Sequence, residues 1–453
     1  MADIWPWIFR AREELLLFSA FWFLVGGADD LLVDLIWIGR GGWRRVTRYR
    51  STPPMSAEQL PKGVNKAPLA ILIPAWKEAA VIGPMLLRCE EAWRESGITY
   101  NVYVGCYRND PATISAILTA ARFHSCIHLV LCDTNGPTTK ADCLNRLWKA
   151  LTADELAGGF KYKAVVLHDA EDYVHPLELR IFDYLIERSA AVQLPVIPVQ
   201  VPGSAWISGH YCDEFAEAHG KSLVVREAMG AAVPLAGVGC AVERNRLGRI
   251  AIERHGLPFD AESLTEDYEL GLGLGADGGK VIFARLRDGD GKIVGTHACF
   301  PETFEASTRQ KARWMTGIAL AGWDRTGWRG GIAEIWMRIR DRKAVFAAFV
   351  LTAAYLCVIL SVVLIALERS GLFSTPPSSR FIQIMLLATL ALLVWRIAMR
   401  CAMVWSIHGP KQALLSVPRS FVANIIAIAA ARRACVTYLR LVFGGRVKWD
   451  KTA

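Results

Sequence analysis

Three acidic residues directly follow a predicted buried strand, in the sequence Asp169-Ala-Glu171-Asp172. Alternate residues at a strand end point the same way, so the carboxylates of Asp169 and Glu171 could converge on one object. Carboxylates that are held close together repel one another unless a cation lies between them. Oxygen ligands suit Mg²⁺ or Mn²⁺, which normally keep phosphate oxygens as further ligands. The alternative interpretation is an acidic turn that caps a helix starting near Pro176.

A second acidic segment, Thr265-Glu266-Asp267, precedes a predicted helix. Thr265 is a favourable N-cap residue, which is the structural interpretation. The functional interpretation makes Asp267 a general base, a group that accepts a proton from a reacting hydroxyl. The G-x-G-x-x-G sequence at 273–278 follows this helix and precedes a predicted strand at 280–284, which is the reverse of a dinucleotide site. It therefore predicts a helix end and a turn.

A third segment with chemical potential is Gln310-Lys-Ala-Arg313-Trp314. If this segment is helical, Gln310 and Arg313 are three residues apart and share one face. Trp314 offers a flat apolar surface suited to the edge of a binding site. A helix at a membrane surface, with Trp and Arg at the headgroup boundary, fits the same residues, and the two interpretations are compatible.

The elements that must position these residues alternate between strands and helices. The predicted strands are 69–74, 100–106, 128–132 and 164–168, and the predicted helices are 79–96, 112–123 and 141–151. This alternation predicts an α/β domain with a mostly parallel sheet covered on both faces. Ligands of such sheets bind beyond the carboxyl ends of the strands. Polar groups follow all four strands there, namely Trp76-Lys77-Glu78, Arg108-Asn109-Asp110, Gly136 to Lys140, and Asp169 to Asp172.

Two of these strand ends carry residues suited to a nucleotide. A carboxylate such as that of Asp110 could bind a ribose or a base. The loop from Thr134 to Lys140 could offer backbone N–H groups or an ammonium to a phosphate. An ordinary solvated loop is the alternative for both positions.

The composition indicates a membrane protein. Of the 453 residues, 53% are hydrophobic and 21% are charged, whereas about 25% charged residues are usual in soluble domains. A membrane-spanning helix needs about 20 apolar residues, and runs of this kind predict spans at 15–38, 344–367 and 381–405. The weaker run at 414–431 predicts an interfacial or re-entrant helix. The Trp- and Arg-rich segment 323–343 is expected to lie along the membrane surface.

Basic residues flank these runs and orient them. Five lie between Arg40 and Arg50, and residues 396–451 contain ten basic residues against one acid. Positive charge lies mostly on the cytoplasmic side, so residues 51–322 are predicted to be a cytosolic domain between the membrane segments of 1–50 and 344–453, with a cytosolic C-terminal tail. Anionic membrane lipids are the expected partners of the basic clusters, and nucleic acid is not expected, because no recognition module lies near them.

Charged residues also occur within the predicted spans. Asp29, Asp30 and Asp34 are expected to face other helices, because acids that face lipid are costly. Arg396 and Arg400 lie four residues apart near one end of a span and share a helix face. We expect them to snorkel to the lipid headgroups, with the lining of a polar path as the alternative.

These motifs occur in the order seen in membrane-bound family-2 glycosyltransferases, which the chain resembles. The series is Leu69-Ala-Ile-Leu-Ile-Pro-Ala-Trp-Lys-Glu78, Asp169-Ala-Glu-Asp172, Thr265-Glu-Asp267 and Gln310-x-x-Arg313-Trp314. Cellulose, chitin and hyaluronan synthases carry a similar series. Tyr107-Arg-Asn-Asp110, Gly136-Pro-Thr-Thr-Lys-Ala-Asp-Cys-Leu-Asn145 and the Asp29-Asp30 pair more closely resemble the bacterial phage adsorption protein B (NfrB-like) group. The resemblance covers about residues 12 to 440. Members often continue into a C-terminal regulatory domain, and because the sequence ends at Ala453, regulation by such a domain is not expected.

The resemblance implies a GT-A fold, a nucleotide-sugar donor and inversion at the anomeric carbon. Matched position by position, the resemblance implies that Asp169 and Glu171 bind the metal and that Asp267 is the base. It implies that Glu266 and Trp314 lie on the acceptor side. The residues that it implies as donor contacts are Glu78, Asp110, Lys140, Asp169, Gln310 and Arg313. The chain departs from the family pattern in two places. The usual D-x-D is D-x-E here, and the usual Asp-Asp-Gly-Ser after the second strand is Arg-Asn-Asp110.

We therefore expect an inverting glycosyltransferase of the bacterial inner membrane that uses Mg²⁺ or Mn²⁺ and a nucleotide-diphosphate sugar, expected to be UDP-linked. Its acceptor is expected to be a polysaccharide or a lipid-linked glycan, in the synthesis of an exopolysaccharide or surface glycan. Three spans are too few to enclose a polysaccharide-wide path. Either the acceptor is lipid-linked or an oligomer or secretion partner completes a channel. The alternative is a non-catalytic membrane scaffold or phage-receptor component that retains a transferase fold.

Overall fold

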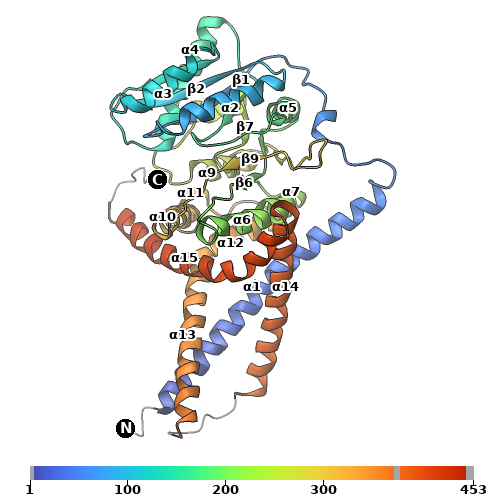
Figure 1. Ribbon diagram of the computed structural model, residues 1–453, viewed down its shortest axis with the longest axis vertical. Coiled ribbons are helices and arrows are strands. Elements are labelled where there is room, and N and C mark those ends of the chain that lie inside the picture. Colours follow the sequence, from blue (N-terminus) through green and yellow to red (C-terminus); the bar gives the residue numbers. More distant parts are fainter. Residues whose placement is uncertain (1–4, 372–377, 445–453) are drawn as a thin grey trace.

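The computed structural model describes residues 5–371 and 378–444. Figure 1 shows an α/β domain, a layer of shorter helices beneath it, and three long helices, α1, α13 and α14, that extend away from both. The bounds of these long helices are Trp5–Thr47, Ala344–Arg369 and Arg380–His408. Part of the predicted basic C-terminal tail, residues 445–453, lies outside the described residues.

A seven-stranded sheet forms the centre of the α/β domain, in the order β3-β2-β1-β4-β7-β5-β8. The four predicted strands are present as β1 (Leu69–Pro74), β2 (Tyr100–Tyr107), β3 (Ile127–Cys132) and β4 (Ala164–Leu167), and they pair in parallel. The later strands are β5 (Ala191–Gln193), β7 (Cys240–Glu243) and β8 (Val281–Phe283). Strand β7 runs antiparallel to both of its neighbours, whereas β5 and β8 are parallel to each other. The predicted mostly parallel sheet is confirmed, with one antiparallel strand that the sequence did not predict.

Helices cover both faces of this sheet, because its strands are apolar on both faces. In β1, Leu69, Ile71 and Ile73 belong to one apolar core, and Ala70 and Leu72 belong to the other. The first core includes α2 (Ile82–Glu95), α3 (Pro111–Ala121) and α5 (Glu178–Leu185). The second includes α4 (Lys140–Gly158), α8 (Arg244–Glu253) and α9 (Glu266–Ala276). The G-x-G-x-x-G sequence falls at the end of α9 and before β8, which confirms that it is a helix end and a turn.

The layer beneath the α/β domain contains shorter elements. A two-stranded parallel sheet pairs β6 (Val196–Pro198) with β9 (Thr296–Ala298). The helices of this layer are α6 (Ile207–Glu217), α7 (Leu223–Ala228), α10 (Phe304–Trp314), α11 (Gly322–Thr326) and α12 (Ile332–Arg342). The predicted helix that carries Gln310, Arg313 and Trp314 is confirmed as α10. This layer connects the chemistry-bearing sheet edge with the long helices.

The acids of α1 contact other helices, as expected. Asp29 accepts a hydrogen bond from Trp336 Nε1 at 2.7 Å, and its Oδ2 lies 2.7 Å from Lys343 Nζ. Asp34 is buried, and its Oδ1 lies 2.5 Å from Lys221 Nζ. Helix α1 itself extends beyond the predicted span at both ends. Its acids therefore connect a long apolar helix to the layer beneath the α/β domain.

The two arginines of α14 differ from the expectation. Arg396 hydrogen-bonds the carboxylate of Asp30 on α1. Arg400 Nε donates to Glu217 Oε1 on α6 at 2.5 Å. The prediction that both guanidinium groups extend to lipid headgroups is therefore wrong. Each pairs with a carboxylate of the protein, because pairing compensates two charges that would otherwise be poorly solvated.

The last helix, α15 (Pro410–Val442), is one continuous helix that contains the run predicted to be interfacial. By length and composition alone, four helices of the described chain could cross a membrane, and α15 is one of them with α1, α13 and α14. Figure 1 shows α15 running crosswise to the other three, directly beneath α6 and α10. The interfacial placement of residues 414–431 stays a prediction.

Candidate active site

The carboxyl ends of the parallel strands bring together two of the predicted donor contacts, Lys140 and Asp169. Lys140 is the first residue of α4, and Asp169 follows β4. The Lys140 ammonium lies 2.5 Å from Asp169 Oδ1. Because β7 is antiparallel and Leu167 pairs with Cys240, the loop before β7 reaches the same edge. Lys140 Nζ also donates to the carbonyl oxygen of Gly237 in that loop, at 3.5 Å.

Asp267 approaches the same point from α9. A Cβ atom on Gly237 would lie 2.5 Å from Asp267 Oδ2 and 3.3 Å from Lys140 Nζ. Gly237 also has a φ of +72°, which side chains rarely adopt. A glycine is therefore required here both by the close approach of Asp267 and by the backbone conformation. The sequence analysis missed this Gly-Val-Gly loop, although two glycines just before a strand are a recognisable signal.

The electrostatics confirm that these carboxylates share one environment. Burial, followed by the neighbouring charges of Asp169 and Glu78, raises the pKa of Glu171 to about 8. Burial and the adjacent Asp267 raise the pKa of Glu266 to about 7. Although burial opposes it, the carboxylates of Asp169, Glu266 and Asp267 raise the pKa of Lys140. Acids from two separate stretches of chain therefore act on one lysine.

The donor set fits a divalent ion that completes its coordination with phosphate oxygens. Within residues 5–371 and 378–444, no group of three or more His, Cys, Asp or Glu side chains is arranged to hold a metal. Mg²⁺ is commonly bound by only one or two protein carboxylates together with substrate phosphates. Asp169 and Glu171 supply two hard oxygen donors, and their mutual repulsion, seen in the raised pKa of Glu171, favours a cation between them.

The α10 residues lie beside the segment that leads into Asp267. Arg313 Nη1 donates to the carbonyl oxygen of Leu264 at 3.0 Å, and the Arg313 charge opposes the effect of burial on the pKa of Asp267. Among the described residues, Gln310 Oε1 is buried without a hydrogen-bond partner. Trp314 packs edge-on against Tyr211, with ring centroids 6.2 Å apart. The predicted motif is thus next to the predicted base.

Asp110 and Glu78 stand at the ends of β2 and β1. Asp110 Oδ2 accepts the backbone N–H of Lys77 at 2.6 Å, and Oδ1 accepts that of Thr113 at 3.4 Å. Asp110 is therefore the N-cap of α3 and holds the loop after β1. Lys77 in that loop has a positive φ of 56°. Glu78 contributes to the charge around Glu171.

Thr265 occupies the predicted N-cap position of α9, but its side chain does not make the capping hydrogen bond. It precedes the first residue of α9, and its side chain makes no capping hydrogen bond. Its Oγ1 is buried without a partner in the described part of the chain. A Cβ on Gly317 would lie 2.5 Å from this oxygen, which shows how closely the backbone after α10 packs on it. The prediction that the Thr265 side chain caps α9 with a hydrogen bond is therefore wrong.

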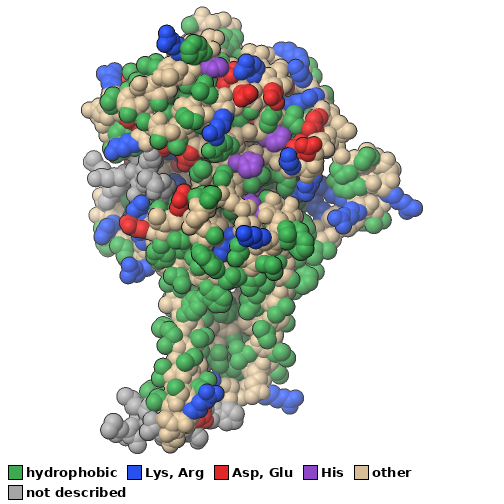
Figure 2. Space-filling view, viewed as in Figure 1, with side chains coloured by type: hydrophobic (Ala, Val, Ile, Leu, Met, Phe, Trp, Pro, Cys, Tyr) green, Lys and Arg blue, Asp and Glu red, His purple; other side chains and the backbone are tan. Residues whose placement is uncertain are grey.

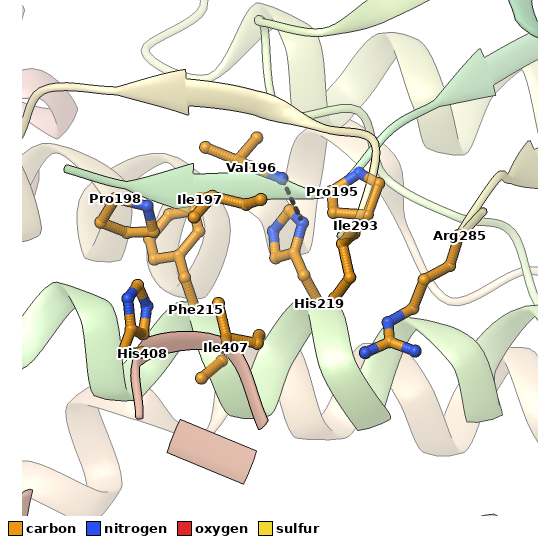
Figure 3. Close-up of a pocket in the computed structure, with 11 residues that line it drawn as sticks. Pro195, Val196, Ile197, Pro198, Phe215, His219, Arg285, Ile293, Ile407 and His408 are labelled. Atoms are coloured by element: carbon orange, nitrogen blue, oxygen red, sulfur yellow. Dashed lines mark hydrogen bonds between the residues drawn. The ribbon is translucent and has the colours of Figure 1, made fainter. Parts of the chain in front are cut away.

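A small pocket lies away from these carboxylates. It is lined by residues of β6, α6 and the end of α14, among them Pro198, Phe215 and His408, and by His219 just after α6 (Figure 3). His219 Nδ1 accepts the backbone N–H of Val196 at 3.0 Å, which fixes the ring. The pocket encloses about 10 Å³, which is room for about one water molecule. It does not have the size of a nucleotide-sugar site.

The fold and the sequence family define the class of protein. The model of glycosyl transferase family group 2 matches residues 164–399, which is more than half of the chain. The mannosyltransferase PcManGT from Pyrobaculum calidifontis, solved in complex with GDP-Man and Mn²⁺, has a TM-score of 0.51 and 16% identity, covering 90% of this chain and 98% of that chain. That likeness shows the GT-A fold. The chain belongs to glycosyl transferase family group 2.

Within this class, the chain is similar to two curated bacterial proteins. It is 35% identical to bacteriophage adsorption protein B of Escherichia coli (strain K12) and to bacteriophage N4 adsorption protein B of Escherichia coli O157:H7. Both alignments extend over 468 residues and cover 98% of this chain and 62% of the relative. The chain therefore spans somewhat less than two thirds of the length of these relatives.

Proposed function

We propose that the chain is an inverting, metal-dependent glycosyltransferase that moves a sugar from a nucleotide-diphosphate sugar to a glycan or lipid-linked acceptor at the bacterial inner membrane. The observation that carries this proposal is the convergence of Asp169 and Asp267 on Lys140 at one sheet edge. Ionisable side chains from distant stretches that gather in one place and shift one another's pKa values are typical of functional sites.

The proposed reaction is a direct displacement. The acceptor oxygen attacks the anomeric carbon while the bond from that carbon to the diphosphate oxygen breaks, and the nucleoside diphosphate leaves with the bonding electron pair. Asp267 accepts the acceptor's proton, and burial, which raises the pKa of this carboxyl, makes it a better base. General-base assistance of this kind contributes about 10²- to 10⁴-fold in rate.

Other side chains of the site would bind the metal, the phosphates, the acceptor and the nucleoside. Asp169 and Glu171 would hold Mg²⁺ or Mn²⁺, which when bound offsets the charge that develops on the departing diphosphate. Lys140 and Arg313 contribute charge-assisted bonds to the same phosphates. Trp314 supplies the apolar surface for the acceptor sugar, with Glu266 on the acceptor side. Glu78 and Asp110 shape the nucleoside end, Asp110 through the loop it caps.

The position of the sheet edge relative to the membrane limits the kinds of acceptor that can reach it. The basic flanks of the long helices favour a cytosolic position for the sheet edge, where nucleotide sugars are available. A lipid-linked acceptor reaches this face directly, and a polysaccharide needs an oligomer or secretion partner to complete a path. The donor was predicted to be UDP-linked, and the GDP-mannose bound to the archaeal structural relative makes GDP-sugars the second group to test.

A donor screen tests this proposal. The full chain in detergent or nanodiscs is incubated with UDP- and GDP-sugars and Mn²⁺, and release of the nucleoside diphosphate is measured. We expect release from one donor, stopped by EDTA and restored by Mn²⁺. Asp169→Ala should abolish Mn²⁺-dependent donor binding, whereas Asp290→Asn, an exposed change in the same domain, should leave it intact. Release that is indifferent to Mn²⁺ would remove the metal from the proposal.

The names of the curated relatives favour a second candidate, a surface component that phage adsorption requires. In that role the transferase fold would be a scaffold. The two candidates separate in one comparison of cells that carry wild-type protein or Asp267→Asn at equal abundance. If only the wild type supports phage adsorption, a product of transfer is needed; equal adsorption with both favours the scaffold.

A further inference from the structure

A buried polar network lies directly behind the turn that carries Asp169 and Glu171. His168 is fully buried at the end of β4. Its Nδ1 lies 3.0 Å from Asp172 Oδ2, and its Nε2 lies 2.9 Å from Glu178 Oε1. The imidazole thus bridges two carboxylates, one within the acidic turn and one on α5.

Both carboxylates have further partners that fix them. Asp172 Oδ2 also accepts the backbone N–H of Asp169, at 3.0 Å. Glu178 Oε1 accepts Trp93 Nε1 from α2 at 2.7 Å, and Thr296 Oγ1 from β9 donates to Glu178 Oε2 at 3.4 Å. The network therefore connects the first residue of the acidic turn to two helices and a strand.

This connection matters because the turn carries like charges. Repulsion between Asp169 and Glu171 favours conformations in which the two carboxylates separate. A turn held by several buried hydrogen bonds resists that separation, since each bond that breaks leaves a buried group unsatisfied. Groups behind a metal ligand commonly orient it in this way.

We propose that His168 is a positioning residue: through Asp172 it fixes the backbone of Asp169, and through Glu178 it anchors the acidic turn, so that Asp169 and Glu171 present a preformed oxygen pair to a divalent ion and a diphosphate. This inference rests on the proposed function. It adds a residue that precedes the acidic motif and that touches neither the ion nor the donor.

The same strand supplies a matched control at its other end. Lys163 directly precedes β4 and is also buried. Its Nζ lies 2.6 Å from Asp183 Oδ1 and 2.8 Å from Glu187 Oε1. Lys163 therefore resembles His168 in burial and in its two carboxylate partners, but it lies at the amino end of the strand, away from the site.

The experiment compares His168→Gln with Lys163→Gln in the full chain. Mn²⁺ binding is measured by electron paramagnetic resonance in the presence of UDP or GDP, and thermal stability is measured on the same samples. Both variants should have a lower Tm, because each removes a buried polar partner of two carboxylates. His168→Gln should bind Mn²⁺ about 10- to 100-fold more weakly, whereas Lys163→Gln should stay within about twofold of the wild type because it touches no group of the turn.

The outcomes test the positioning role of His168 and the metal-dependent function separately. Wild-type affinity in a folded His168→Gln protein would overturn the positioning role, and so would equal losses in both variants. A wild-type protein that binds no Mn²⁺ with either nucleotide would instead overturn the metal-dependent function itself. If His168→Gln does not fold, Asp172→Asn replaces it, because it keeps the shape of the bridge and should weaken Mn²⁺ binding over the same range.

Discussion

Two groups of charged side chains differ in how completely they are paired. The active-edge cluster contains four carboxylates and two cations, namely Asp169, Glu171, Glu266, Asp267, Lys140 and Arg313. The helix-junction network contains four carboxylates and five cations, namely Asp29, Asp30, Asp34, Glu217, Lys221, Arg340, Lys343, Arg396 and Arg400. The first has more acidic than basic groups, and the second does not.

This difference distinguishes a site from a structural joint. In the helix-junction network each carboxylate has a cation within 4 Å, so the network connects α1 and α14 to the layer above them and requires no ligand. In the active-edge cluster Glu171 has no such partner within the described residues, and burial together with repulsion from Asp169 and Glu78 raises its pKa. A bound cation would relieve this repulsion. Charge balance therefore indicates where a ligand belongs.

The largest expected effect follows from removing the proposed base. Asp267→Asn preserves the size of the side chain but cannot accept the proton. We expect transfer to fall by about 10²- to 10⁴-fold, while donor binding, measured by calorimetry with a nucleoside diphosphate and Mn²⁺, changes little. Normal transfer by this variant would show that another group is the base.

Breaking the helix-junction network should affect stability instead of chemistry. Asp34→Asn leaves the buried Lys221 ammonium without its 2.5 Å partner. Removal of one member of a buried ion pair costs about 3 to 5 kcal/mol, so thermal unfolding in detergent should occur at a clearly lower temperature. The affinity of the folded fraction for Mn²⁺ and nucleotide should not change. Asp290→Asn, in an exposed pair with Lys292, is the control that should leave Tm as it is.

The glycine loop before β7 should tolerate no side chain. In Gly237→Ala the new methyl group would lie 2.5 Å from Asp267 Oδ2, at a φ that costs about 1 to 2 kcal/mol for other residues. We expect the rate of transfer to fall at least tenfold. Gly230→Ala, also at positive φ but with open space around it, is the matched control for backbone strain alone. Equal activity of the two variants would contradict the close approach of Asp267.

A smaller effect is expected in the pH dependence. Asp267 must be ionised to accept a proton, so transfer decreases as the pH falls through its pKa. Burial raises that pKa above the ordinary value of 3.8, and the Lys140 ammonium opposes the rise. Lys140→Met removes this opposition, so the acid limb of the kcat profile should move to higher pH. If the acid limb of the kcat profile stays at the same pH or moves to lower pH, Lys140 lies too far from Asp267 to lower its pKa.

The sequence predicted the first half of the fold well, because β1 to β4 are apolar strands that each end in a polar cluster. It did not predict the antiparallel β7, since Cys240–Glu243 is short and its direction depends on pairing with β4 and β5. The prediction for Arg396 and Arg400 was wrong for a similar reason. Their partners, Asp30 and Glu217, are distant in sequence, and no local pattern indicates such pairs.

For the site, sequence patterns identified the acids but not their supports. Asp169 and Glu171 were chosen for their place after a predicted strand and Asp267 for its place just before a predicted helix, and Lys140 does connect two of them. The hydrogen bond from the Lys77 backbone to Asp110 was missed because it joins loops that follow two different strands. His168 was missed because one buried histidine carries no spacing signal, and its two carboxylate partners become evident only in three dimensions.

The most direct test of the central claim is a structure of the full chain with Mn²⁺ and a nucleoside diphosphate, with the ion located by anomalous scattering. We expect one Mn²⁺ peak coordinated by Asp169 and Glu171 and by diphosphate oxygens, with Asp267 facing the space beside them. A peak elsewhere, or a diphosphate bound at this edge without these two carboxylates, would contradict it.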